Sequence, residues 1–458
     1  MAMGKRNSER QVELWVATTA VAEPPGHPFY RRLNGLLAQN GFDPFVEGLC
    51  QKFYHEELGR PGIPPGVYFR LLLIGYFEGI DSERGIAWRC ADSLTLRQFL
   101  GYDLTEATPD HSSLTRIRQR MDLETHEAVF TWVLQALARG GLLKGKTLGI
   151  DATTLEANAA MRSIVRRDTK ESYTSFLTGL AAASGIATPT REDLAKIDKG
   201  RKNKASNQDW EHPHDPDAKI AKMKDGRTHL AHKAEHAVDL QTQAIVAVTL
   251  QPADRGDPES LDDTLSVTME TLAAVATDPA AADQLADEVL AETVTDKGYH
   301  SNEALTGQRR VGIRTYCSEP ERGRRDWQDR SEEQAAVYAN RRRIRGRRGK
   351  RLLRRRGELL ERPFAHCYDT GGMRRTHLRG HGNILKRLLV HVAGFNLGLL
   401  MRKLFGLGKP RTLQGLSGIL LALVSALRAL VMALERLWRG WHRCRRVRTC
   451  YPAAMLVA

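Results

Sequence analysis

The sequence predicts an α+β fold in which a helical amino-terminal region precedes a mixed sheet flanked by helices. Residues 1 to about 140 carry apolar residues at helical spacing, with Pro near predicted helix starts and Gly near predicted ends. From residue 144 onward, short apolar strands alternate with helical patterns, which is typical of a sheet with helices on its faces. The 458 residues, 41% of them apolar, suffice for two or more folding units.

The amino-terminal region has helical patterns at residues 28–41, 65–79, 82–101 and 108–121. In the last pattern, Ser112 or Ser113 is predicted to cap the helix. Arg116 and Arg118 project away from its apolar line, so we expect a DNA-binding pair of helices joined by a tight turn. A surface helix with solvated arginines explains this segment equally well.

The sheet region begins with a strand at 147–150 that ends in Asp151. Residues 162–227 are polar and of mixed charge, so we interpret them as a long insertion or flap outside the core. Further along we expect a hairpin at 229–251, a helix at 261–276, a strand at 292–295 ending in Asp296, a helix from residue 301, a strand at 312–317 and a helix at 384–406.

Positive charge dominates the chain. It has 69 basic against 54 acidic residues, a net charge of +15 that favours polyanionic partners, although a basic soluble protein would show the same surplus. Eleven of the sixteen residues at 341–356 are basic. A solvated face is the usual meaning of a charge run, but self-repulsion at this density favours contact with phosphates. The predicted DNA-binding residues of this run are Arg341, Arg342, Arg343, Arg345, Arg347, Arg348, Lys350, Arg351, Arg354 and Arg355.

A reducing, cytoplasmic location is expected. The six cysteines are far apart and form no CxxC, and the first residues carry no apolar core of a secretory signal. Residues 415–438 are strongly apolar but have Arg428 near the middle, which favours a packed or oligomerising helix over a membrane span.

Two carboxylates suggest metal chemistry. Asp151 ends an apolar strand and Asp296 ends the strand ETVTD, and a side chain at a strand end can be held rigidly at a cleft. Either one alone could simply cap a helix or form a turn, but two in one alternating domain favour a site for Mg²⁺ or Mn²⁺. The histidines His229, His232, His236 and His300 also raise the question of zinc, which we do not expect because the segment with two of them reads as a strand.

The chain resembles the DDE transposases of bacterial insertion sequences, with an InsH-type helical amino-terminal domain. The resemblance covers roughly residues 25 to 410 and is carried by PDHSSLTRIRQR, GIDATTLEANAAMRSIVRRDT, DGRTHLAHKAEHAVDL, VTDKGYHSNEAL, RRGELLERPFAHCYDTGGMRR and HVAGFNLGLLMRKL. It implies a helical DNA-binding domain at 1–140, a ribonuclease-H-like catalytic domain at 141–410 and a carboxy-terminal tail at 411–458.

The resemblance also implies roles for single residues. Asp151 in GIDATT, Asp296 in TDKGYHS and Glu361 in LLERPF match the three metal-binding carboxylates, with Glu358 as the alternative for the third. The family's lysine position is occupied by Tyr368, so Arg374 or Arg375 is expected to supply that charge and contact DNA.

The implied function is transposition. Two Mg²⁺ or Mn²⁺ ions would serve cleavage at terminal inverted repeats and joining of the 3′-hydroxyl to target DNA, within a homodimeric complex near the nucleoid. Two alternatives stay open: a nuclease of the same fold without strand transfer, and a non-catalytic or decayed DNA-binding protein.

Overall fold

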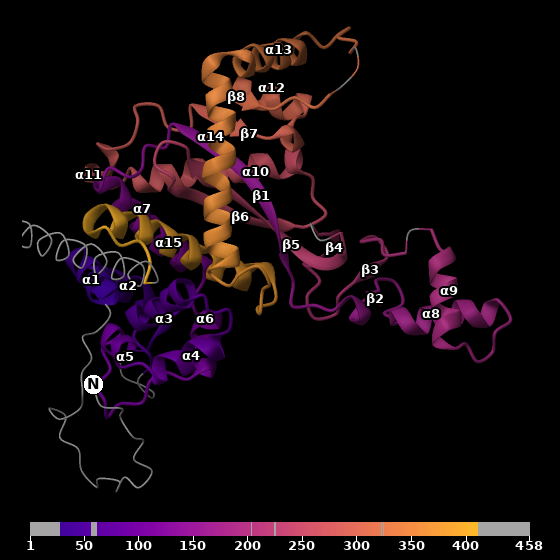
Figure 1. Ribbon diagram of the computed structural model, residues 1–458, viewed down its shortest axis with the longest axis horizontal. Coiled ribbons are helices and arrows are strands. Elements are labelled where there is room, and N and C mark those ends of the chain that lie inside the picture. The colour runs from indigo at the N-terminus through magenta and orange to yellow at the C-terminus, as the bar shows by residue number, and fades with distance from the viewer. Residues whose placement is uncertain are drawn as a thin grey trace, which may run out of the picture.

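A computed structural model describes residues 28–55, 62–202, 204–223, 226–321, 323 and 325–410 (Figure 1). Its amino-terminal region is helical, as predicted. The helices are α1 (Pro28–Gln39), α2 (Phe42–Cys50) with the 3₁₀ turn η2 (Gln51–Phe53), α3 (Pro65–Glu78), α4 (Glu83–Ala91), α5 (Leu94–Leu100), α6 (His111–Arg120) and α7 (Leu123–Arg139).

Helix ends in this region follow the capping chemistry of the sequence. Ser82 caps α4 and Ser93 caps α5 through their hydroxyl groups. Asp110 caps α6 by accepting the backbone N–H of Ser112, which corrects the expectation that Ser112 or Ser113 is the cap. Ten residues separate α5 from α6, so the predicted tight turn between paired helices is absent from this part of the described chain.

The sheet is mixed, with six strands in the order β4–β5–β1–β7–β8 and with β6 also paired to β5. Strand β1 is antiparallel to β5, and β5 is antiparallel to both β4 and β6. Strands β7 and β8 continue the sheet parallel to β1. The bounds are β1 (Thr147–Glu156), β4 (Lys219–Lys222), β5 (Thr228–Asp239), β6 (Ile245–Pro252), β7 (Glu292–Thr295) and β8 (Arg314–Cys317).

Strand β1 is longer than the sequence predicts. It continues past Asp151 to Glu156, because its pairing with β5 continues from Asp151 opposite His236 to Glu156 opposite Ala231. The apolar run that suggested the strand stops at Ile150, but backbone hydrogen bonds to a neighbouring strand do not depend on side-chain polarity. Asp151 therefore lies inside a strand and not after one.

Helices cover both faces of the sheet (Figure 1). Helix α14 crosses one face against β1, β7 and β8, while α10 packs on β5 and β6. The remaining elements are α10 (Asp257–Val275), α11 (Pro279–Ala282), the 3₁₀ turn η4 (Lys297–Tyr299), α12 (Asn302–Arg310), α13 (Ser331–Arg345), α14 (Arg347–Phe364), the π-helical turn η5 (Ala365–Asp369) and α15 (His381–Phe405).

The predicted insertion is a small folded unit that projects from the sheet (Figure 1). Its residues Ile164 and Trp210 are buried with Leu230 of β5, and Phe176 packs against the same cluster. The insertion therefore has a core of its own, and its last strand, β4, joins the main sheet, which the polar composition did not predict. Its other elements are η3 (Met161–Ser163), β2 (Val165–Arg166), α8 (Tyr173–Ala183), α9 (Arg191–Gly200) and β3 (Trp210–Glu211).

Helix α15 joins the helical region to the sheet. It packs against α3, α7 and β6, and a single cluster of buried side chains runs from Phe29 to Leu407. The amide of Asn396 accepts from and donates to the backbone of Ile245 at 3.0 and 2.8 Å. By length and composition α15 could span a membrane, but 89% of its most apolar window is buried inside the fold, which indicates a core helix. The apolar segment 415–438 lies outside the described residues.

The close approach of α15 to α3 gives a test of this junction. A Cβ atom at Gly394 would lie 2.5 Å from Cδ1 of Tyr76, whose ring is 1% exposed and cannot move aside. We expect Gly394→Ala to lower the free energy of unfolding by about 1–3 kcal/mol. Gly382→Ala, in the exposed first turn of α15 where nothing lies within 4 Å, is the matched control. Urea unfolding of both variants measures the difference, and equal stabilities would contradict the packing described here.

Candidate active site

The two predicted aspartates lie side by side on neighbouring parallel strands. The β1–β7 pairing sets Leu148 opposite Thr293 and Gly149 opposite Val294, so two residues further along Asp151 is level with Asp296. Gly149 and Asp151 are two residues apart, and positions two residues apart in a strand point to the same face of the sheet. Asp296 directly follows β7 and caps the turn η4 by accepting the backbone N–H of Gly298 at 2.9 Å.

Asp151 is an unusual carboxyl group because most of it is withdrawn from water. Its side chain is 29% exposed, and one oxygen, Oδ2, lies 2.6 Å from Nη2 of Arg356 on α14. Burial raises the pKa of Asp151 to about 6, the Arg356 charge opposes that shift, and the charges of Asp296 and Asp257 add to it. Three acidic side chains therefore share one electrostatic environment at this edge of the sheet.

Glu361 does not join them in this structure. It is exposed on α14, five residues after the inward-pointing Arg356 and thus about 140° around the helix from it. Leu352, Leu359 and Leu360 are buried and hold the opposite face of α14 against the sheet. Glu358, the alternative third carboxylate, is also exposed. Within the described ranges, no three His, Cys, Asp or Glu side chains are gathered closely enough to hold a metal ion.

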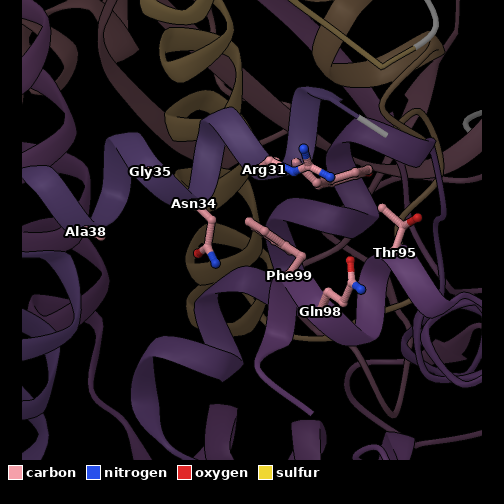
Figure 2. A pocket seen from close by; sticks show the side chains of 8 residues that line it. Arg31, Asn34, Gly35, Ala38, Thr95, Gln98 and Phe99 are labelled. Atoms are coloured by element: carbon pink, nitrogen blue, oxygen red, sulfur yellow. The ribbon is translucent and has the colours of Figure 1, made fainter. Parts of the chain in front are cut away.

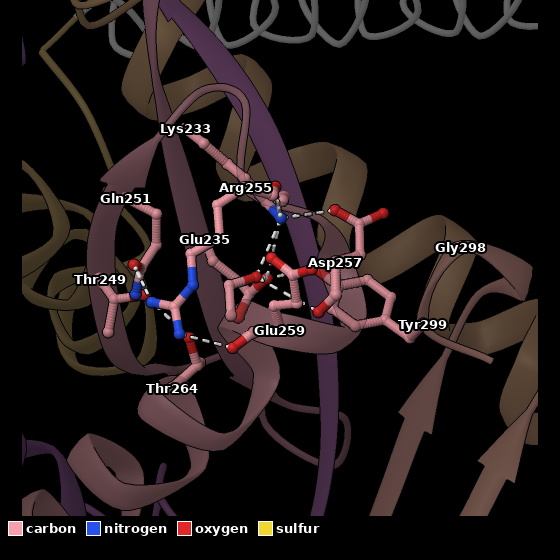
Figure 3. A network of polar contacts seen from close by, with 12 residues as sticks. Lys233, Glu235, Thr249, Gln251, Arg255, Asp257, Glu259, Thr264, Gly298 and Tyr299 are labelled. Carbon is pink, nitrogen blue, oxygen red and sulfur yellow. Dashed lines mark hydrogen bonds and ion pairs between the residues drawn. The ribbon is translucent and has the colours of Figure 1, made fainter. Parts of the chain in front are cut away.

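Asp257 is a neighbour that the sequence analysis missed. It opens α10, and its Oδ1 forms a 2.6 Å ion pair with Nζ of Lys233 (Figure 3). A Cβ atom at Gly298 would lie 2.6 Å from Oδ2 of Asp257 and 3.1 Å from Oδ1 of Asp296, so these two carboxylates face each other across that glycine. The sequence does contain a sign of this helix start, because an acidic residue before Pro258 is typical of a first helical turn. The predicted helix nevertheless began at residue 261, so Asp257 was left outside it.

A buried polar network supports this edge of the sheet from the α10 side (Figure 3). Glu235 is fully buried and accepts hydrogen bonds from the Tyr299 hydroxyl at 2.6 Å and the Ser260 hydroxyl at 3.0 Å. Burial, followed by the Glu235 charge, raises the pKa of Tyr299 well above its usual range. Lys233 donates to Ser260 at 2.9 Å. The network ties β5 and α10 to the turn η4, which follows Asp296 directly.

The basic residues predicted to bind DNA divide into two groups. Several are engaged in the fold: Arg341 pairs with Glu319 at 2.6 Å, Arg343 donates to the carbonyl of Thr315 at 2.8 Å, and Arg348 pairs with Glu292 at 2.5 Å. Others are exposed and contact no acidic side chain among the described residues, namely Arg342, Arg345, Arg347, Lys350, Arg351, Arg354 and Arg355. Four of these, Arg347, Lys350, Arg351 and Arg354, recur at helical spacing on α14, and we call these four the α14 basic stripe.

The prediction that Arg118 contacts DNA does not agree with its position in the structure. It is 7% exposed and forms an ion pair with Glu83, so it stabilises the packing of α6 on α4 and has no surface to offer to DNA. Arg116 is exposed on α6 and donates to the Ser112 hydroxyl at 3.1 Å. The helical periodicity placed both arginines off the apolar line, but α4 covers the side of α6 that carries Arg118.

The region around Tyr368 is packed in the protein interior. Tyr368 is fully buried in η5, and its hydroxyl lies 2.5 Å from Nε2 of His236, whose pKa burial lowers to about 3. The Arg374 guanidinium lies over the Tyr368 ring and donates to the Thr153 hydroxyl at 3.0 Å. Thr153 is on the same face of β1 as Asp151, and Arg374 also forms an ion pair with Asp369 at 2.9 Å, so its predicted role at the site stays a prediction. Arg375 is more exposed and lies 3.7 Å from Glu156.

A separate surface hollow lies between α1 and α5 in the helical region (Figure 2). It is lined by Tyr30, Arg31, Asn34, Gly35, Ala38, Thr95, Gln98 and Phe99. None of the predicted carboxylates lines it. The hollow therefore has no part in the chemistry suggested by the sheet edge.

The buried state of Asp151 predicts how stability changes with pH. Because the folded protein holds this proton more tightly than the unfolded chain, the stability it contributes is present below the ordinary pKa of 3.8 and is lost as the pH rises through about 6. Asp151→Asn has no such proton, so its stability relative to the native protein should increase between about pH 4 and pH 7. Urea unfolding at several pH values measures this, and a pH-independent difference would contradict the assignment.

Comparison with known proteins bears on the helical region. Residues 20–120 match a family model described as a transposase domain (DUF772). In the described part of the chain this match covers α1 to α6 and ends before Asp151 and Asp296. A search of curated proteins found no match, and neither did a search of solved structures. The amino-terminal region is thus similar to a transposase domain.

Proposed function

We propose that this protein is a DDE-type transposase, which binds terminal inverted repeats, cleaves the DNA ends and joins the freed 3′-hydroxyl to target DNA. The observation that carries the proposal is that the β1–β7 register brings Asp151 level with Asp296, with Arg356 of the basic helix α14 against Asp151. The transposase domain at 20–120 supports the general class. The DDE chemistry and the strand transfer are the proposed part.

The sheet topology supports a ribonuclease-H-like catalytic domain. Strands β5 and β6 form an antiparallel hairpin beside β1, and β7 and β8 extend the sheet parallel to β1. Helices lie on both faces. This is a mixed sheet flanked by helices, as the sequence resemblance implies, with a long insertion between β1 and β5.

The donor set fits Mg²⁺ or Mn²⁺ at Asp151 and Asp296. Both side chains offer hard carboxylate oxygens, and these ions are held by few protein ligands together with water. The Arg356 guanidinium, 2.6 Å from Asp151, stands in for a cation at this position. When bound, a pair of such ions would supply activation of the attacking hydroxyl and stabilisation of the leaving oxygen.

Other features of this chain would position the two carboxylates and bind the DNA. The β1–β7 register brings Asp151 and Asp296 level, the pairing of β1 with β5 holds Asp151, and the cap of η4 holds Asp296. The exposed α14 basic stripe would bind phosphates of the DNA backbone along the solvent-facing side of α14. The third carboxylate stays a prediction: the sequence resemblance points to Glu361, whereas the structure places Asp257 nearer to the two aspartates.

One observation favours a second candidate function. Because Glu361 faces away from Asp151, the protein could bind transposon ends without cleaving them. Such a non-catalytic protein would keep the transposase domain and the α14 basic stripe and have no use for the paired aspartates. A nuclease without strand transfer would cleave the ends and not join them.

Cleavage of a labelled terminal repeat in Mg²⁺ tests the proposal. We expect Asp151→Asn and Asp296→Asn each to reduce cleavage and joining by about a thousandfold or more, with DNA binding retained. Loss of activity in Glu361→Gln but not in Asp257→Asn would assign the third ligand to Glu361, and the reverse would assign it to Asp257. Cleavage that survives in Asp151→Asn would contradict the proposed site, and binding with no cleavage by the native protein would support the non-catalytic alternative.

The salt dependence of DNA binding tests the α14 basic stripe. If Arg351 and Arg354 each neutralise one phosphate, replacing either by Gln should reduce the slope of log K against log salt by about 0.9 for duplex DNA. Arg310→Gln is the control, because Arg310 is exposed on α12 but paired with Glu332 at 2.7 Å. Unchanged slopes for both α14 variants would exclude this helix from the DNA interface.

A further inference from the structure

We infer that Arg356 neutralises Asp151 when no metal is bound. When metal binds, the Arg356 side chain moves to a DNA phosphate. The inference rests on the proposed function. It concerns the one cationic side chain of the basic run that lies 2.6 Å from a predicted metal ligand. The other described arginines of this run contact other partners or solvent.

The position of Arg356 is set by helix packing. It lies on the face of α14 that Leu352, Leu359 and Leu360 press against the sheet, and its side chain is 12% exposed. Its Nε donates to the carbonyl of Ile150 at 3.4 Å, directly beside Asp151 in β1. Arg356 therefore places a positive charge beside Asp151, the strand residue that the sequence predicts to be a metal ligand.

The pairing with Asp151 is close but not directional. Nη2 of Arg356 is buried and lies 2.6 Å from Oδ2 of Asp151, yet its N–H bonds meet no acceptor in hydrogen-bonding geometry. The other oxygen, Oδ1, accepts the backbone N–H of Ala152 at 2.9 Å. Charge neutralisation holds the pair together, since a buried carboxylate without a counter-ion is costly. A divalent cation would provide the same neutralisation and would repel the guanidinium.

The structure also indicates where a displaced guanidinium would act. Arg354 and Arg355, the two residues before Arg356, are exposed, so the neighbouring turn of α14 presents positive charge to solvent. The planar guanidinium fork binds phosphate oxygens in a bidentate manner, which a lysine ammonium cannot do. Arg356 would thus leave Asp151 for a DNA phosphate bound next to the two aspartates.

Binding of Mn²⁺ to the DNA-free protein, followed by electron paramagnetic resonance, tests the first half of the inference. Arg356→Gln removes the competing charge, so we expect its Mn²⁺ affinity to rise by about tenfold. Arg354→Gln, on the same helix but exposed, should leave the Mn²⁺ affinity unchanged. An Arg356→Gln protein that is folded by circular dichroism and binds Mn²⁺ no more tightly than the native chain would overturn the inference.

Cleavage at saturating Mn²⁺ tests the second half. Arg356→Gln should cleave more slowly although it binds the ion more tightly, and Arg356→Lys should recover little of the rate because it lacks the bidentate fork. A fully active Arg356→Gln enzyme would overturn the transfer to phosphate. Failure of the proposed function itself would look different: Mn²⁺ binding would then be the same in Asp151→Asn as in the native protein.

Discussion

The parallel pairing of β1 with β7 is the constraint on which the candidate site depends. This register sets two aspartates, 145 positions apart in the chain, level with each other on adjacent strands. Strand pairing fixes such positions firmly, because a slip of one residue would turn every side chain of the strand to the other face. Nothing in the side chains of Asp151 and Asp296 draws them together, since like charges repel. The backbone imposes their proximity, and the surroundings must then compensate for it.

Cationic side chains on both sides of this part of the sheet offset the repulsion between the carboxylates. Arg356 of α14 neutralises Asp151, and Lys233 of β5 pairs with Asp257. The raised pKa of Asp151 shows that the compensation is incomplete, because burial outweighs the guanidinium charge. An incompletely neutralised carboxyl group, held rigid by a strand, is a group prepared to bind a further cation. The same features that make this edge costly for stability make it suitable for chemistry.

Much of the fold could be predicted from the sequence because it follows local patterns. The helices at 28–39 and 65–78 begin near Pro and end near Gly, and the 228–252 hairpin follows its alternating strands. The proximity of Asp151 and Asp296 was also predicted, since each lies at the end of a predicted strand. The orientation of Glu361 could not be predicted, because it depends on which face of α14 the sheet covers. Arg118, Arg356 and Asp257 were misjudged or missed for the same reason: their partners Glu83, Asp151 and Lys233 are distant in sequence.

The central claim is that Asp151 and Asp296 together bind a divalent cation. A crystal structure of the protein soaked with Mn²⁺, with anomalous scattering recorded at the manganese edge, tests it most directly. We expect an anomalous peak between the two carboxylates, with the Arg356 guanidinium moved away from Asp151. An anomalous map with no peak at this edge of the sheet, and Arg356 still paired with Asp151, would contradict it.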